Sequence, residues 1–225
     1  MSRLARGRPV ALGALVSALT VAGCAPDHPS AVVGVRADGC GATAAEGSGA
    51  MIADGTVLTA AHTVAGATTV HIVSSHGSET AVVVGLDPTN DLALLRVRDR
   101  GIPVLPAASE RPPPGSPATV YAWRNGTVRR VDVTIVRPIV ISTTDLYAEA
   151  HTERPGYQLA GTILPGDSGA AVLVGGHLVG VVWARSSATP GRAYAIDVAA
   201  LAPDPGADLA RCAATPAGEP GPAPP

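Results

Sequence analysis

Residues 165–169 read Pro-Gly-Asp-Ser-Gly, a stretch that leaves the hydroxyl of its serine uncrowded. The glycines allow the backbone to turn its N–H groups toward one point. An accessible hydroxyl beside converging N–H donors is the arrangement that acyl transfer requires, because the donors stabilise the oxyanion that forms. The stretch therefore makes Ser168 a candidate nucleophile.

Two further candidates lie upstream of this serine. Residues 58–62 read Leu-Thr-Ala-Ala-His, so His62 follows a predicted strand and has small neighbours that let its imidazole face a cleft. Residues 89–95 read Thr-Asn-Asp-Leu-Ala-Leu-Leu, so Asp91 immediately precedes an apolar strand, where a carboxylate can be buried beside a histidine. Asp87 is the rival acid, but the proline after it favours a turn. We predict that Asp91 is the acid.

Short apolar segments separated by Gly, Pro, Asn and Asp continue from residue 31 onward. So many short segments favour an all-β barrel or sandwich. The predicted strands are residues 32–35, 50–53, 57–58, 69–73, 81–85, 92–97, 118–122, 128–136, 170–174, 178–183 and 193–196. Only residues 197–212 have room for a longer helix, and two prolines interrupt them, so we expect a short C-terminal helix or an irregular return.

The order His, Asp, Ser at these spacings, inside an all-β chain, resembles the chymotrypsin-like (trypsin-like) serine peptidase family. The likeness covers roughly residues 31–200 and is greatest to the bacterial branch that includes the high-temperature-requirement peptidases and the mycobacterial acid-resistance serine protease. It implies two six-stranded antiparallel Greek-key β-barrels with the active site in the cleft between them. It also implies a serine endopeptidase that acts on a protein or peptide substrate and needs no cofactor.

The resemblance assigns a role to each candidate. Ser168 becomes the nucleophile, His62 the base that takes its proton, and Asp91 the buried acid that orients the histidine. The backbone N–H groups of Gly166 and Ser168 become the oxyanion hole. Counting from Ser168 implies four substrate-binding positions, which are Thr162, Trp183, Ala184 and Arg185.

The chain departs from the family pattern at two places. Residues 170–171 are Ala-Ala, where relatives usually have Gly-Pro. Arg185 stands where relatives often have a small residue that keeps the pocket open, and Thr162 offers no acid to favour a basic side chain, so we expect a small or medium uncharged residue before the cleaved bond. In animal relatives the residue matching Asp167 pairs with a newly freed N-terminus. A lipidated Cys24 has no free amine for that role, so any control of activity must have another basis.

The N-terminus has the pattern of a bacterial lipoprotein leader. Residues 1–8 are basic, residues 9–22 are apolar but too few to span a bilayer comfortably, and Val-Ala-Gly-Cys at 21–24 resembles a lipobox. We expect lipidation at Cys24 and a lipid anchor at the outer face of the cell membrane of a bacterium. The alternative is an ordinary signal peptide with a chance cysteine, which makes a secreted protein.

These patterns divide the chain into four segments. They are a signal peptide (1–23), a tether (24–30), a peptidase domain (31–212) and a disordered tail rich in Pro, Ala and Gly (213–225). Cys40 and Cys212 lie near the two ends of the peptidase domain. An exported compartment permits a disulfide between them, and two unpaired thiols are the alternative.

Charge and motifs exclude several classes of function. The formal net charge is −2, which gives no sign of a nucleic-acid partner, and no zinc-finger spacing or His-Glu-x-x-His motif indicates a metal. An α/β-hydrolase esterase would order its triad Ser, acid, His. A catalytically weak lipoprotein of this fold that binds peptides or envelope proteins is the remaining alternative to the peptidase. The sequence leaves the oligomeric state open.

Overall fold

The computed structural model describes residues 29–41, 43–98 and 101–214. The predicted signal peptide, the lipidation site Cys24 and most of the predicted tether and tail lie outside these ranges. Within the described ranges, no helix has the length and apolar character needed to cross a membrane.

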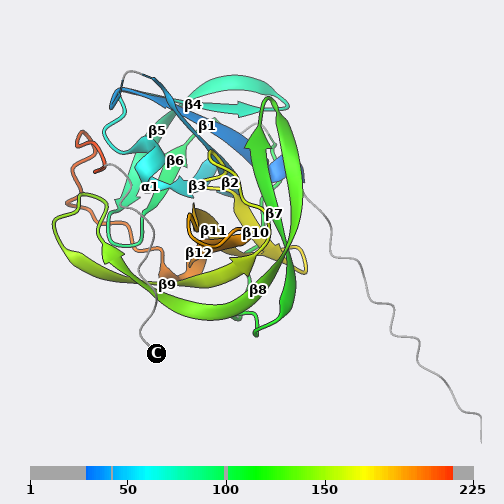
Figure 1. Ribbon diagram of the computed structural model, residues 1–225. Coiled ribbons are helices and arrows are strands. Elements are labelled where there is room, and N and C mark those ends of the chain that lie inside the picture. Colours follow the sequence, from blue (N-terminus) through cyan, green and yellow to red (C-terminus); the bar gives the residue numbers. More distant parts are fainter. Residues whose placement is uncertain (1–28, 42, 99–100, 215–225) are drawn as a thin grey trace, which may run out of the picture.

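Two closed six-stranded barrels form the described part of the chain (Figure 1). The first barrel contains β1 (Val32–Asp38), β2 (Ala45–Ala53), β3 (Thr56–Ala60), β4 (Thr69–Ser74), β5 (Gly77–Asp87) and β6 (Leu92–Arg96), with the single helical turn α1 (Ala61–Val64) after β3. The second contains β7 (Ser116–Arg124), β8 (Thr127–Thr144), β9 (His151–Ala160), β10 (Ala171–Val174), β11 (His177–Arg185) and β12 (Arg192–Asp197). The short 3-10 turns Pro29–Ala31 and Val198–Ala200 stand at the two ends of this pair.

The two barrels share one topology. In each, the strands follow the order first, second, third, sixth, fifth, fourth, and all neighbours are antiparallel. The fourth strand returns to pair with the first, as in a Greek key. The predicted fold of two six-stranded antiparallel barrels is therefore confirmed.

The strand that the sequence did not predict is β9. Its sequence, His-Thr-Glu-Arg-Pro-Gly-Tyr-Gln-Leu-Ala, contains proline, glycine and charged residues, which are depleted in strands. Residues 156–160 pair with both β8 and β12, but residues 151–155 pair with β8 alone. Pro155 therefore lies where one side of the strand is free and a missing N–H is tolerated.

Each barrel has its own apolar core, and a third apolar cluster joins them. That cluster takes Val32, Leu58 and Leu92 from the first barrel and Tyr121 and Val181 from the second. All five are at most 2% exposed. Burial of this shared surface fixes the barrels against each other, and residues from both can contribute to one site.

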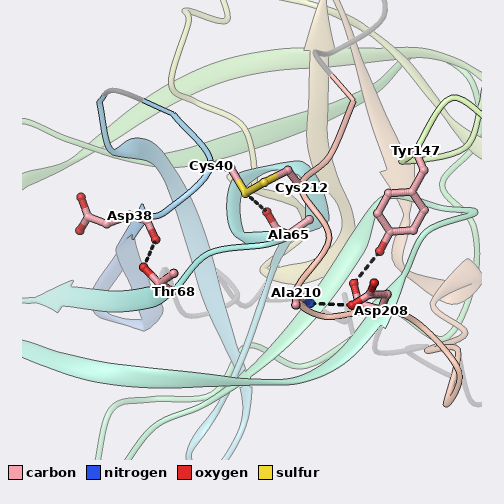
Figure 2. Close-up of a disulfide and its surroundings, with 8 residues drawn as sticks. All are labelled: Asp38, Cys40, Ala65, Thr68, Tyr147, Asp208, Ala210 and Cys212. Atoms are coloured by element: carbon pink, nitrogen blue, oxygen red, sulfur yellow. Dashed lines mark hydrogen bonds between the residues drawn. A yellow bond between two sulfur atoms is a disulfide. The ribbon is translucent and has the colours of Figure 1, made fainter.

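Residues 201–214 form an irregular segment, which we call the C-terminal strap, that runs back over the first barrel. Cys212 of the strap is bonded to Cys40, so the predicted disulfide is confirmed (Figure 2). The N–H of Gly66 donates to the carbonyl of Leu209 at 3.2 Å. Of the two expectations for this part of the chain, the irregular return is correct.

The strap also contacts the loop between β8 and β9. The hydroxyl of Tyr147 donates to the carbonyl of Asp208 at 3.0 Å, and the guanidinium of Arg211 lies 4.4 Å from the centroid of the same tyrosine ring. The N–H of Ala214 donates to the carbonyl of Leu146 at 3.0 Å. The strap therefore connects the first barrel to a loop of the second.

Candidate active site

The register of two strands brings His62 and Asp91 together. β3 and β6 pair so that Ala60 lies opposite Leu92. His62 follows the end of β3 on α1, and Asp91 directly precedes β6, so the two residues meet at the same edge of the barrel. The N–H of Ala61 donates to the carbonyl of Asp91 at 3.0 Å, which fixes this edge.

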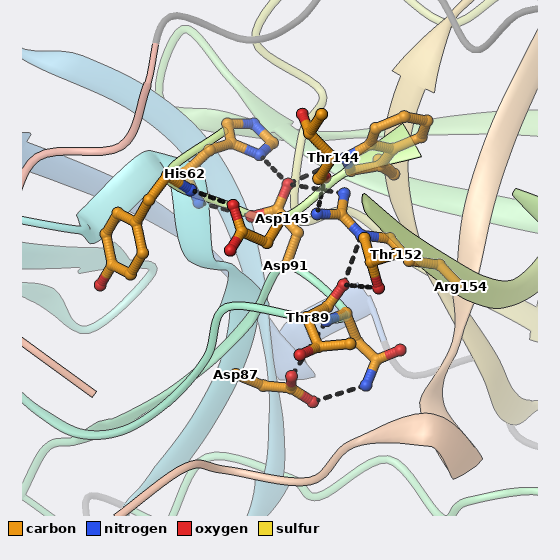
Figure 3. Close-up of polar contacts among 11 residues, drawn as sticks. His62, Asp87, Thr89, Asp91, Thr144, Asp145, Thr152 and Arg154 are labelled. Carbon is orange, nitrogen blue, oxygen red and sulfur yellow. Dashed lines mark hydrogen bonds and ion pairs between the residues drawn. The ribbon is translucent and has the colours of Figure 1, made fainter. Parts of the chain in front are cut away.

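The carboxylate of Asp91 makes two short contacts with the histidine (Figure 3). Its Oδ2 lies 2.7 Å from Nδ1 of the His62 ring, and its Oδ1 accepts the backbone N–H of His62 at 2.7 Å. The Asp91 side chain is 5% exposed. Asp91 has a φ of 57°, in the left-handed region that a short polar side chain such as aspartate can adopt.

The environment shifts both pKa values. Burial lowers the pKa of His62, but the charge of Asp91 and the hydrogen bond to it raise that pKa more, so it lies above its ordinary value. Burial raises the pKa of Asp91, but the charges of His62 and Arg154 and the hydrogen bond to His62 lower it more, so it lies below its ordinary value. Asp91 is therefore an ionised partner for the ring at neutral pH.

The rival acid, Asp87, has a different setting. It accepts hydrogen bonds from the backbone and side-chain N–H groups of Asn90 at 2.9 Å each, and from the backbone N–H of Ala202 at 2.8 Å. Asp87 therefore holds the turn before β6 and the start of the C-terminal strap, whereas Asp91 is the acid that contacts His62.

Ser168 lies in a turn that is packed between the two barrels. Its carbonyl accepts the N–H of Ser48 from β2 at 2.7 Å, and the N–H of Gly169 donates to the carbonyl of Val182 on β11 at 2.9 Å. Gly169 has a φ of +83°, and a Cβ there would overlap the carbonyl oxygen of Ser48. Only glycine fits this position, because it tolerates both the left-handed conformation and the close backbone approach.

The turn is also held by Asp167, whose side chain is fully buried. Its Oδ2 pairs with Nη2 of Arg129 and accepts the N–H of Leu164 at 2.7 Å. Its Oδ1 lies 3.4 Å from Nη1 of Arg124, and that guanidinium also donates to the carbonyl of Pro165 at 2.9 and 3.0 Å. Two arginines of the β7–β8 hairpin thus fix the residues that precede Ser168.

Gly166 lies inside this turn with a φ of +89°. Its left-handed conformation is available to glycine at little cost. The sequence predicts that its N–H and that of Ser168 form an oxyanion hole, and the turn that carries both groups is held by the contacts of Asp167. This role stays a prediction.

Two more residues face the oxygen of Asp91 that contacts His62. The indole Nε1 of Trp183 donates to Oδ2 of Asp91 at 2.8 Å. Nη1 of Arg154 lies 3.8 Å from the same oxygen. The sequence placed Trp183 in the substrate-binding wall, and its contact with Asp91 was not foreseen. Arg154 was missed entirely, because it belongs to the strand that was not predicted.

Two hollows lie beside residues of the candidate site. One is lined by His62, Trp183 and Ala184, together with Leu146 and Ala214. The other is lined by residues that include Gly47, Trp123, Arg124, Pro165 and Gly166. Of the predicted substrate-binding positions, Trp183 and Ala184 thus line the first hollow, and Thr162 and Arg185 are exposed. In the described part of the chain, no group of three or more His, Cys, Asp or Glu side chains could hold a metal ion.

Comparison with known proteins agrees with this geometry. A family model described as a trypsin-like peptidase domain matches residues 47–181. The chain is 30% identical over 141 residues to the serine protease Rv3671c of Mycobacterium tuberculosis, a match that covers 61% of this chain and 36% of that protein. It is 32% identical over 156 residues to the putative serine protease HhoB of Synechocystis, a match that covers 68% of this chain and 37% of that protein. The match thus spans little more than a third of each relative.

Solved structures with the same fold include the active form of Rv3671c from M. tuberculosis, with a TM-score of 0.74 at 24% identity, covering 88% of this chain and 89% of that one. The HtrA-type protease AlgW, solved with a tripeptide, gives a TM-score of 0.64 at 23% identity, and the match covers 76% of this chain and 57% of that one. At these identities the likeness shows the shared fold.

Proposed function

Since the chain belongs to the trypsin-like peptidase domain family, we propose that it is a serine endopeptidase in which Ser168, His62 and Asp91 are the catalytic residues. The observation that carries the proposal is the contact of 2.7 Å between Nδ1 of His62 and the buried carboxylate of Asp91, whose pKa lies below its ordinary value. A hydrogen bond at Nδ1 fixes the ring tautomer and leaves Nε2 to accept a proton.

The proposed reaction passes through an acyl-enzyme. The Oγ of Ser168 attacks the peptide carbonyl carbon as its proton moves to Nε2 of His62, and the carbonyl oxygen becomes an oxyanion that the N–H groups of Gly166 and Ser168 bind. His62 then gives the proton to the leaving amine as the C–N bond breaks. Water, activated by the same histidine, hydrolyses the ester.

The hollows beside His62 and beside Gly166 favour an endopeptidase. An enzyme that cuts within a chain must hold substrate on each side of the cleaved bond. The hollow beside His62 and the hollow beside Gly166 offer that space. Protein or peptide substrates are also consistent with the structure of the HtrA-type protease AlgW, which was solved with a tripeptide.

Labelling with a fluorophosphonate probe tests the activity. We expect purified protein to be labelled covalently, and Ser168→Ala and His62→Ala to abolish labelling, because phosphonylation needs both the hydroxyl and its base. Asp87→Asn is the matched control, since Asp87 is a buried acid of the same turn without a contact to His62. A folded wild-type protein that is not labelled would contradict the proposal and favour a protein of this fold that binds peptides or envelope proteins.

We also propose that the protein is exported and anchored by a lipid on Cys24. The leader sequence supports this location, as does a relative named a probable periplasmic serine endoprotease DegP-like in Marinomonas. In bacterial cells expressing the full chain, we expect the protein to sediment with membranes and Cys24→Ala to move it to the soluble exported fraction. A Cys24→Ala protein that still sediments with membranes would overturn the lipid anchor and leave the peptidase proposal intact.

A further inference from the structure

Arg154 is a buried cation whose side-chain hydrogen bonds reach the turn before Asp91 and the end of β8. Its side chain is 2% exposed. Its Nε donates to the carbonyl of Thr89 at 2.6 Å, and its Nη2 donates to the carbonyl of Thr144 at 2.9 Å (Figure 3). These two bonds fix the plane of the guanidinium, so that its remaining nitrogen, Nη1, faces Oδ2 of Asp91 at 3.8 Å.

The hydrogen bond from Arg154 to Thr89 also affects the backbone of Asp91. Thr89 lies two residues before Asp91, and Asp91 has the left-handed φ of 57°. A non-glycine residue in that region costs free energy and persists only where surrounding contacts hold it. The bond from Arg154 to the Thr89 carbonyl is such a contact.

Trp183, on strand β11 of the second barrel, also contacts Asp91. Its Nε1 donates to Oδ2 of Asp91 at 2.8 Å, and Cζ of Arg154 lies 5.3 Å from the centroid of its ring. A cation over an indole face is attracted by the ring electrons, most strongly where water is excluded. The oxygen of Asp91 that contacts His62 thus also receives the indole N–H and faces the guanidinium.

We propose that Arg154 and Trp183 are positioning residues for catalysis, which hold the carboxylate of Asp91 against Nδ1 of His62. The proposal rests on the peptidase function proposed above. Burying an arginine carries a large desolvation penalty unless it is paired and hydrogen-bonded. Beside Asp91 that penalty is offset by an opposite charge, and the carboxylates of Asp87 and Asp145 add to the compensation.

The charge of Arg154 predicts a pH signature. The groups that act on His62 are Asp91, which raises its pKa, and Arg154, which lowers it, and Asp87 and Asp145 are the other carboxylates that act on Arg154. His62 must be neutral to accept the serine proton, so activity falls as the pH drops through its pKa. Removing the cation raises that pKa and moves the fall in activity to higher pH.

The test measures the second-order rate of fluorophosphonate labelling against pH for wild type and three variants. Arg154→Met, which replaces the charged side chain with an unbranched apolar one, is expected to shift the acid limb to higher pH, and Arg154→Lys is expected to restore it toward wild type. Trp183→Phe keeps an aromatic ring but removes the N–H, and is expected to slow labelling by about tenfold to a hundredfold, the usual contribution of a hydrogen bond to a charged group.

Arg211→Met is the matched control, because Arg211 also stacks on an aromatic ring, that of Tyr147, but pairs with Glu149 instead of Asp91. We expect its pH profile to match that of wild type. A folded Arg154→Met with an unshifted acid limb, or a Trp183→Phe labelled as fast as wild type, would overturn the positioning role. If Arg154→Met does not fold, Trp183→Phe decides. Absence of labelling in wild type would instead contradict the peptidase function.

Discussion

Replacing both Arg124 and Arg129 by methionine is expected to lower the free energy of unfolding by about 3 to 5 kcal/mol, the usual cost of leaving a buried charge without its partners. Asp167 is fully buried, and the two guanidinium groups are its side-chain ion-pair partners. Without them the carboxylate keeps only the N–H of Leu164. Urea unfolding followed by circular dichroism measures the loss.

The same double variant is expected to lose fluorophosphonate labelling under conditions where it remains folded. Asp167 and the Pro165 carbonyl that Arg124 holds both lie in the turn that carries Ser168. Arg130→Met is the control, since Arg130 lies in the same hairpin and forms an exposed ion pair with Asp132, and such pairs are worth about 0 to 1 kcal/mol. Equal stability of the double variant and this control would show that Asp167 needs neither arginine.

Removing the disulfide is the second large perturbation. Cys40 and Cys212 are 172 residues apart, and a loop of that length restricts the unfolded chain strongly. Cys40→Ser with Cys212→Ser is expected to lower the free energy of unfolding by about 2 to 5 kcal/mol, which thermal melting of the non-reduced protein will register as a lower midpoint.

A reducing agent separates the effect of the bridge from that of the substitutions. Dithiothreitol is expected to lower the midpoint of wild type to that of the double serine variant and to leave the variant unchanged. Identical melting of wild type with and without reductant would mean that the strap is held by its hydrogen bonds alone. Those bonds include the one between Gly66 and Leu209 and the one between Leu146 and Ala214.

The parts of the site that were predicted from sequence depend on local patterns. Small residues before His62 and an apolar strand after Asp91 were enough to place each at the end of a strand, and pairing of β3 with β6 brings those ends together. The glycines at 166 and 169 likewise indicated a tight turn around Ser168. Most strands were found because their apolar residues lie between turn residues.

The parts that were missed depend on contacts between distant segments. Arg154 lies on a strand whose proline and charges conceal its pairing, and its contact with Thr89 joins residues 65 positions apart. Trp183 was placed in a binding wall by counting, but its bond to Asp91 spans 92 positions. A local sequence pattern does not indicate contacts between residues so far apart in the chain. No internal partner was predicted for Asp167, whereas the β7–β8 hairpin supplies Arg124 and Arg129 as its ion-pair partners.

The C-terminal strap makes the order of synthesis matter. The N–H of Gly66, just after α1, bonds to the carbonyl of Leu209, and the neighbouring disulfide needs Cys212, so residues that follow the second barrel hold the barrel that is synthesised before it. N-terminal units generally begin to fold before the rest of a chain has emerged. Here the first barrel lacks these contacts until the second barrel and the strap have both been made.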